Sequence, residues 1–383
     1  MIFLGQASNY RFGRALRHLF AHGNKHDLES LQLALAKRYQ VELADGNVYH
    51  GQKGLAEAAK ERVRLYQTGR SALAAAIMVV APKGSKVVIP GLTCIAVVRA
   101  VKAAGCEPVF ADINSQTLQY DWKSLDKTLK VCYNGVIVAQ NTLGLPIDMQ
   151  KLEDLAAKHH CQIVEDLAHS AGRFYPDGRE VGTVGAATAL SFGKGKAIDT
   201  IAGGALILRK GIAGAIAAPM QKPRLGDRWR ARWYPLLGNI MRAGYHVGLG
   251  KVVTAVFLKF HWIKRSADAE LNLDQKLMPW QAKLALRQLG NLPKTPLREW
   301  CLVKKREELL RECKKRGYYL DEIWYDAPVS PARYAKEADF PAKDCPETVR
   351  VAKQIINLPT WYPEEKLAPV RVLIKQYQED DHE

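Results

Sequence analysis

Two lysines and a serine stand in a glycine-rich loop that follows an apolar run, in the segment Leu190-Ser191-Phe192-Gly193-Lys194-Gly195-Lys196. A lysine in a partly desolvated pocket loses proton affinity and can form a Schiff base with an aldehyde. The glycines let the backbone approach a bulky ligand. The segment therefore predicts a covalent aldehyde site, although taken alone it fits surface lysines in a glycine turn equally well.

Two earlier segments offer partners for such a ligand. In Ile163-Val164-Glu165-Asp166-Leu167-Ala168-His169 an apolar run ends in an acid, and a histidine follows three residues later. The carboxylate can pair with a cationic ring nitrogen, and the histidine can contact a cofactor. Gly69-Arg70-Ser71 opens a long apolar helical pattern, whose free N–H groups and positive dipole end can bind phosphate. Alone, each segment also fits an ordinary helix start or cap.

The elements that must position these residues alternate from about residue 65 to 210. Strands are expected at Lys86–Pro90, Pro108–Asp112, Gly135–Gln140, Gln162–Asp166, Ala187–Phe192 and Ala205–Leu208, with helices near 71–80, 93–104, 122–130 and 148–159. This alternation predicts a largely parallel sheet covered by helices on both faces. Ligands bind beyond the carboxyl ends of such strands, which is where the acid and the lysine loop are expected.

The order of phosphate cradle, strand-end acid, serine and lysine resembles the fold-type I pyridoxal-phosphate enzymes. More closely, the chain resembles the DegT/DnrJ/EryC1/StrS aminotransferase family, known for aminating nucleotide-linked keto-sugars. Phrases similar to the family's are Gly84-Ser85-Lys86-Val87-Val88-Ile89-Pro90, Ala104-Gly105-Cys106-Glu107-Pro108, Gly144-Leu145-Pro146-Ile147-Asp148 and Ile356-Asn357-Leu358-Pro359. The resemblance implies an aspartate-aminotransferase-like α/β fold, with a mostly parallel sheet between helices and a smaller C-terminal α+β domain.

The resemblance also implies a role for each site residue. Lys196, five residues after Ser191, is the expected Schiff-base lysine and proton shuttle, and the family spacing favours it over Lys194. Asp166 is expected to keep the pyridine nitrogen protonated, which makes the ring an electron sink. His169 is expected near the phenolic oxygen of the cofactor. Ser191 and the backbone of Gly69, Arg70 and Ser71 are expected to bind the phosphate, and no metal is expected.

Three departures from the family pattern affect the expected site. Arg70 replaces a threonine, and its guanidinium could supply the lost donor. Cys94 stands where the family often has an aromatic residue that stacks on the cofactor ring, so the second face of the ring is left open. Asp274-Gln275-Lys276 replaces a partner-subunit segment that contacts phosphate, and an aspartate there would repel phosphate. These departures indicate that the chain resembles a divergent branch of the family.

From these patterns we expect four segments along the chain. They are a helical lead-in at 1–50, a large pyridoxal-phosphate domain at 51–215, a basic aromatic insertion at 216–275 and a small C-terminal domain at 276–383. In the last segment, helical periodicity is expected at Trp280–Leu289 and Glu299–Arg316, and again at Pro363–Gln378.

The composition of the chain indicates an ordinary globular protein from a reducing compartment. Its 383 residues carry a formal net charge of +17, and 48% of them are hydrophobic, which is ordinary for a globular protein. Seven cysteines with no Cys-x-x-Cys pair argue against a disulfide framework or zinc ribbon and favour free thiols in a reducing compartment. We find no signal-peptide pattern at the N-terminus and no apolar run long enough to span a membrane. The expected location is the cytoplasm, with possible attachment to the inner face of the membrane.

Much of the positive charge lies between residues 221 and 265, where ten lysines and arginines accompany one acid, a net charge of +9. Three tryptophans, two tyrosines and two phenylalanines are interleaved with them. This mixture suits a membrane–water interface. An ordinary helical insertion with inward-packed aromatics fits the same pattern, and so, less well, does a nucleic-acid surface.

The expected reaction is transamination on Lys196, with glutamate as amino donor and a nucleotide-linked keto-sugar as acceptor. Two alternatives remain open: amination of a lipid-linked or long-chain ketone at the membrane surface, and a non-catalytic membrane-associated relative. The family generally builds its active site at a dimer interface, so the resemblance implies a homodimer. No nucleic-acid-reading module is recognised, and no nucleic-acid partner is expected.

Overall fold

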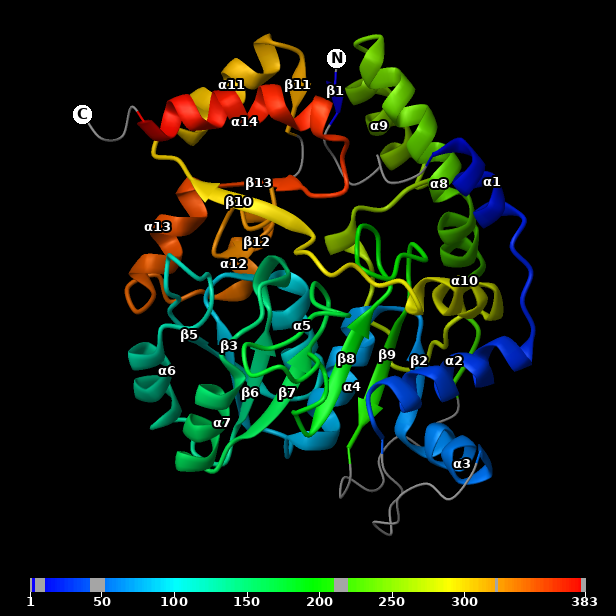
Figure 1. The fold of residues 1–383 in the computed structure, drawn as a ribbon, viewed down its shortest axis with the longest axis vertical. Helices are drawn as coiled ribbons and strands as arrows, with labels where there is room; N and C mark the ends of the chain where they lie inside the picture. Colours follow the sequence, from blue (N-terminus) through cyan, green and yellow to red (C-terminus); the bar gives the residue numbers. More distant parts are fainter. Residues whose placement is uncertain (1, 4–10, 42–51, 210–219, 321–322, 380–383) are drawn as a thin grey trace.

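A seven-stranded sheet forms the centre of the protein (Figure 1). The computed structural model describes residues 2–3, 11–41, 52–209, 220–320 and 323–379. From one edge to the other, the sheet runs β2 (Val63–Tyr66), β9 (Gly204–Leu208), β8 (Ala187–Ser191), β7 (Gln162–Asp166), β6 (Val136–Gln140), β3 (Lys86–Pro90) and β5 (Glu107–Ala111). The five strands from β8 to β5 are parallel, whereas β9 and β2 pair antiparallel. The predicted mostly parallel α/β sheet is thus confirmed.

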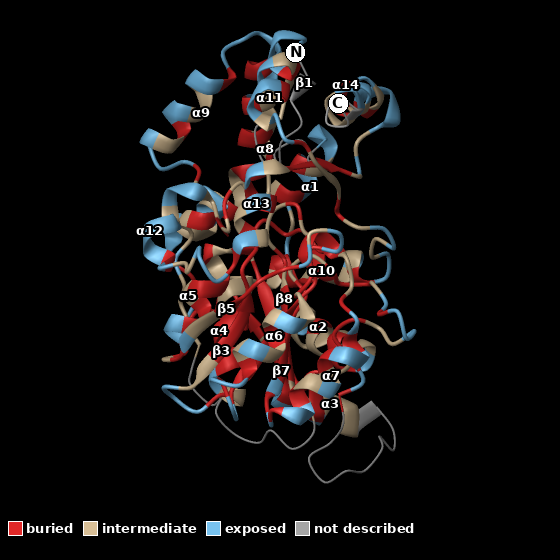
Figure 2. Cartoon of the chain, turned by 90° about the vertical axis from the view of Figure 1, so that its left-hand side faces the viewer, coloured by how far each residue is buried: buried red, intermediate tan, exposed pale blue. Residues whose placement is uncertain are grey.

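Helices cover both faces of this sheet. The side chains of β6 show why, because Val136 and Val138 pack with α4 (Gly69–Val80) and α5 (Ile95–Ala103), whereas Ile137 and Ala139 face the other side. That other side is covered by α2 (Lys25–Arg38), α6 (Trp122–Leu129), α7 (Met149–Lys158) and α10 (Pro279–Leu289). Burial is concentrated in the strands and in the helix faces that touch them (Figure 2).

A smaller antiparallel pair lies above the carboxyl ends of the main strands (Figure 1). It joins β10 (Arg298–Leu302) to β13 (Ile355–Pro359), and α11 (Arg306–Lys315), α13 (Pro346–Gln354) and α14 (Glu364–Glu379) surround it. The predicted single helix at Glu299–Arg316 is therefore wrong in its first part. Its residues up to Leu302 belong to β10, because they pair with β13 rather than continue the helical pattern of α11.

Two short strand pairings and several further helices complete the described chain. β4 (Thr93–Cys94) pairs with β12 (Val329–Ser330), and β1 (Ile2–Phe3) pairs with β11 (Tyr318–Tyr319). The insertion forms α8 (Leu225–His246) and α9 (Gly250–Lys259), and α1 (Phe12–Leu19) packs on α8. The remaining elements are α3 (Gln52–Arg62), α12 (Ala335–Ala338), η2 (Thr142–Gly144), η3 (Ser266–Asp268) and η4 (Ala332–Tyr334). The expected segment boundaries near residues 50 and 215 lie outside the described residues.

Candidate active site

The predicted strand-end acid, Asp166, is the last residue of β7 and only 8% of its surface is exposed. Its Oδ1 accepts a hydrogen bond from the Ala168 N–H at 2.9 Å. Burial raises the pKa of Asp166, while that hydrogen bond and the positive charge of Lys196 oppose the rise. A buried carboxylate of this kind is stabilised by a cationic partner.

His169 follows in the turn after β7 and stacks on Trp324, with ring centroids 4.6 Å apart and an interplanar angle of 21°. Its Nδ1 lies 3.3 Å from the hydroxyl of Tyr325. Burial lowers the pKa of His169 well below its usual value, and the charges of Lys196 and Arg298 lower it further. The imidazole is therefore neutral at physiological pH.

The two lysines of the glycine loop point to different parts of the protein. Lys196 places its Nζ 4.5 Å from the ring centre of Trp324, on the same indole that stacks on His169. Lys194 instead donates from its Nζ to the carbonyl of Lys264 at 2.8 Å, and the same Nζ lies 4.0 Å from the ring centre of Tyr234. The site therefore gathers Lys196 with Asp166 and His169, whereas Lys194 reaches the insertion.

The start of α4 lies directly against the end of β8. A Cβ built on Gly69 would stand 2.5 Å from both the Cβ and the Oγ of Ser191, so only glycine fits there without displacing its neighbour. Thr68 caps the helix by accepting the Ser71 N–H at 3.1 Å, and the hydroxyls of these two residues are 2.8 Å apart. The Ser71 hydroxyl also accepts from the backbone N–H of Asn272. The predicted cradle thus has the Gly69 backbone and Ser191 side by side, while the Ser71 side chain serves the cap.

Arg70 and Cys94 both make contacts that belong to the helices beside the site. The Arg70 guanidinium donates to the carbonyls of Ser266, Ala267 and Ala269 and so ties α4 to η3. Three of the guanidinium N–H groups are engaged by these carbonyls, and the role expected of Arg70 toward phosphate stays a prediction. Cys94 caps α5, with its Sγ accepting from the Ala96 N–H at 3.5 Å, and it is partly exposed.

Three residues of the site escaped the sequence reasoning: Trp324, Tyr325 and Arg298. The Arg298 guanidinium lies 4.3 Å from the ring centre of Trp324 and donates to the Asn357 Oδ1 at 3.0 Å. The Asn357 side chain also accepts from the Trp324 N–H at 3.2 Å and donates to the Trp324 carbonyl at 2.8 Å. One signal was available, because Asn357 is the polar residue of the Ile-Asn-Leu-Pro phrase, and a buried asparagine in a strand requires partners.

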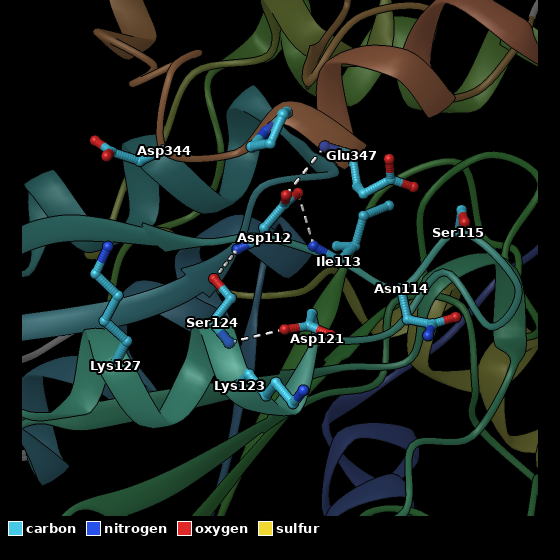
Figure 3. Close-up of a pocket in the computed structure, with 11 residues that line it drawn as sticks. Asp112, Ile113, Asn114, Ser115, Asp121, Lys123, Ser124, Lys127, Asp344 and Glu347 are labelled. Carbon is cyan, nitrogen blue, oxygen red and sulfur yellow. Dashed lines mark hydrogen bonds between the residues drawn. The ribbon is translucent and has the colours of Figure 1, made fainter.

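A cavity of about 440 Å³ lies elsewhere, between β5, α6 and the start of α13 (Figure 3). At its edge the Asp112 carboxylate accepts from the backbone N–H groups of Ile113, Glu347 and Thr348, and from the Thr348 hydroxyl. These bonds cap α13 and tie the C-terminal segment to the main sheet. The cavity contains none of the residues gathered around Trp324, and the chemistry favours the Trp324 site.

Comparison with known proteins identifies the family. Residues 63–372 match the model of the DegT/DnrJ/EryC1/StrS aminotransferase family. GDP-perosamine synthase of Escherichia coli O157:H7 is 32% identical over 125 residues, which are 33% of this chain and 34% of that protein. L-glutamine:2-deoxy-scyllo-inosose aminotransferase of Streptomyces kanamyceticus is 30% identical over 124 residues, 32% of this chain and 29% of that protein. The matches thus span about a third of the length of these curated relatives.

The fold agrees over nearly the whole chain with a solved structure, the PMP form of the putative sugar aminotransferase Spr1654 from Streptococcus pneumoniae. The TM-score is 0.66 at 15% identity, and the comparison covers 97% of this chain and 98% of that one. The same neighbour has also been solved in a PLP form, in agreement with the predicted cofactor. From the family model and the shared fold, the chain belongs to the DegT/DnrJ/EryC1/StrS aminotransferase family.

Proposed function

We propose that the protein is a pyridoxal-phosphate-dependent aminotransferase that moves an amino group from glutamate to the keto group of a nucleotide-linked sugar. The observation that carries the proposal is the convergence of Lys196, Asp166 and His169 at the carboxyl ends of β7 and β8, with Trp324 touching two of them. The family and the aminotransferase names of the relatives support the same chemistry.

The residues present fit this cofactor. Asp166 would face the ring nitrogen, because a ring N–H cation offsets the cost of keeping a buried carboxylate charged. Ser191 and the start of α4 at Gly69 would hold the phosphate, since glycine leaves backbone donors accessible at the positive end of the helix. His169, neutral and held by Trp324 and Tyr325, would contact the ring oxygen.

When bound, the cofactor supplies an aldehyde that takes up the amino group and a ring that withdraws electrons. The Lys196 amine would act as the base that removes a proton from the substrate carbon and as the acid that returns it. Trp324 limits the positions open to this amine, and a cationic ring nitrogen beside Asp166 would favour the charged form of its carboxylate. The positive net charge of the chain favours the approach of an anionic nucleotide-sugar.

We propose further that two copies assemble around the site in the cytoplasm, as the family resemblance implies. The same chemistry on a lipid-linked or long-chain ketone is a second candidate. It is favoured by the exposed apolar side chains on and beside α8 and α9, among them Trp229 of α8 and Phe260, the C-cap residue of α9. A screen of soluble and lipid-linked ketones, with glutamate or glutamine as donor, distinguishes the two acceptors and the two donors.

Borohydride reduction of the cofactor-loaded protein, followed by peptide mapping, tests the assignment of the lysine. The expected result is a cofactor-modified Lys196 in the wild type and in Lys194→Ala, and no modification in Lys196→Ala. Modification of Lys194, or of neither lysine, would overturn the assignment. Lys194→Ala is the matched control because it stands in the same loop and its amine contacts Lys264 and Tyr234 instead.

A further inference from the structure

Two surface helices expose apolar side chains at helical spacing. On α1 these are Phe12 and Leu16, with Phe20 at its C-cap, and they are 59%, 36% and 67% exposed. On α9 they are Val252, Val256 and the C-cap residue Phe260, at 61%, 40% and 59%. Residues four apart lie on one side of a helix, so each set forms a continuous stripe that faces water.

The long helix α8 joins these two helices into one surface. Arg232 of α8 donates to the carbonyls of His18, Leu19 and Ala21, and so satisfies the end of α1. At the other end of α8, Gly244 and Tyr245 lie against Gly250 at the start of α9. In Figure 1 the three helices lie at the upper right of the molecule. In Figure 2, α8 lies between α9 and α1, and the outer side of α9 is exposed. We call this surface the α1–α8–α9 face.

Apolar exposure is concentrated on this face. Of the eighteen exposed large hydrophobic residues recorded in the described chain, twelve lie in α1, α8, α9 or the short connections beside them. The nine on the insertion side are Leu225, Trp229, Ile240, Val247, Leu249, Val252, Val256, Phe260 and Trp262. Scattered exposed apolar residues are normal, but a concentration of this kind marks an interaction surface.

The charge of the face indicates what covers it. The segment 221–265, which contains α8 and α9, carries a net charge of +9 in sequence, of which Arg224 and Lys264 pair with Glu270. α1 with its N-cap adds Arg11, Arg14 and Arg17 without any acid. On α9, the exposed Lys251 and Lys259 stand directly beside the apolar stripe. Apolar and aromatic side chains flanked by cations match an anionic lipid surface, where rings enter the headgroup region and cations meet lipid phosphates.

We propose that the α1–α8–α9 face docks the protein on an anionic phospholipid membrane. The described helices include none that is long and apolar enough to cross a bilayer, so the contact is with the membrane surface. A second copy of the chain fits less well, because an isologous contact would place this cationic face against itself. The inference goes beyond the proposed reaction and does not depend on it.

Flotation of the full-length protein with phosphatidylcholine vesicles, with and without phosphatidylglycerol, tests the proposal. The wild type is expected to float only with the phosphatidylglycerol vesicles, and high salt is expected to release it. F12S/L16S/F20S and V252S/V256S/F260S should each lower the bound-to-free ratio by about tenfold or more, since each removes three inserted side chains. K251Q/K259Q should weaken binding and reduce its dependence on salt.

V131S/Y133S is the matched control, because Val131 and Tyr133 are equally exposed, at 63% and 61%, just after α6. It should bind vesicles like the wild type. Far-UV circular dichroism and retention of the cofactor confirm that each variant is folded, and a protein inactive on every ketone can still pass this test. Failure of the wild type to float, or equal flotation of the stripe variants, would overturn the proposal. The proposal would also be overturned if the wild type were a dimer that does not float and a stripe variant were a monomer, because the face would then bind a second copy of the chain.

Discussion

Replacing Trp324 tests whether one indole organises the site. Its ring contacts three groups: the stacked neutral imidazole of His169, the Lys196 Nζ at 4.5 Å and the Arg298 guanidinium at 4.3 Å. Partly desolvated cation–π contacts contribute about 0.5–2 kcal/mol each, and aromatic stacking contributes about 0.5–1.5 kcal/mol. Trp324→Leu keeps an apolar side chain but loses all three, so we expect it to lower the free energy of unfolding by about 2–4 kcal/mol.

The same variant should also slow the reaction. Without the indole, the Lys196 amine and His169 sample more orientations, and a loss of only about 1.4 kcal/mol of positioning lowers the rate tenfold. We therefore expect kcat to fall at least about tenfold in Trp324→Leu and less in Trp324→Phe, which retains a smaller aromatic face.

Urea unfolding of the apo-protein and single-turnover kinetics with the amino donor measure the two effects separately. Trp361→Leu is the control, because Trp361 is 39% exposed and stacks only on its chain neighbour Tyr362 among the described ring contacts. If Trp324→Leu unfolds and turns over like Trp361→Leu, the indole has no organising role and the reasoning fails.

Three further predictions concern a glycine at the site and two buried polar side chains outside it. Gly69→Ala forces a Cβ against Ser191, so it should lower the free energy of unfolding by about 1–3 kcal/mol and weaken the affinity for the cofactor phosphate. Gly290→Ala is the control and should cost little stability, because the space around its Cβ is open. Urea unfolding measures the stability of both variants, and cofactor titration measures their affinity. Asp112→Ala removes the acceptor for three backbone N–H groups and should destabilise the protein by about 2–3 kcal/mol, as followed by urea unfolding. Burial, assisted by the charges of Arg14 and Arg232, lowers the pKa of His18 from 6.5 to about 3. Below pH 6.5 His18 binds a proton in the unfolded chain but stays neutral in the folded protein until about pH 3. The free energy of unfolding should therefore fall by about 1.4 kcal/mol per pH unit over that range. His18→Phe should lack this fall, and unfolding at pH 7 and pH 5 compares the two proteins.

Much of the fold was predictable because the parallel strands are short, apolar and followed by well-patterned helices. β3 and β7 begin and end at the predicted residues. β2 was missed because its four residues gain their partner, β9, only from a segment about 140 residues away. β10 was read as helix for a related reason, since the charged residues of Arg298–Leu302 carry no strand pattern and only the distant β13 makes them a strand. Pairing between remote segments leaves little local signal.

The family resemblance favours Asp166 and Lys196 over their neighbours, and the backbone direction gives a physical reason for that preference. Glu165 and Asp166 are consecutive acids at the end of β7, and successive strand side chains point to opposite faces. On the face of the sheet opposite Asp166, the Glu165 carboxylate is occupied by hydrogen bonds from the backbone N–H groups of Gly182 and Val184, at 2.6 and 2.7 Å. Asp166 is thereby left as the acid of the site. In the lysine loop, Gly195 has a φ of +71°, a conformation that side chains disfavour, and the lysines on its two sides diverge.

The family resemblance places an aromatic residue at position 94, and in this chain the aromatic ring beside Lys196 is Trp324, from the C-terminal segment. Cys94 lies in β4, which pairs with β12 only a few residues beyond Trp324 and Tyr325. Asn357 of β13 fixes the Trp324 backbone on both sides, and Asp112 holds α13, the helix that leads directly into β13. A cysteine at position 94 is therefore compatible with an ordered site, because the aromatic ring beside Lys196 belongs to Trp324. Residues 94 and 324 are about 230 positions apart in the chain, and the pairing of β4 with β12 brings their segments together, so a comparison of single positions does not relate them.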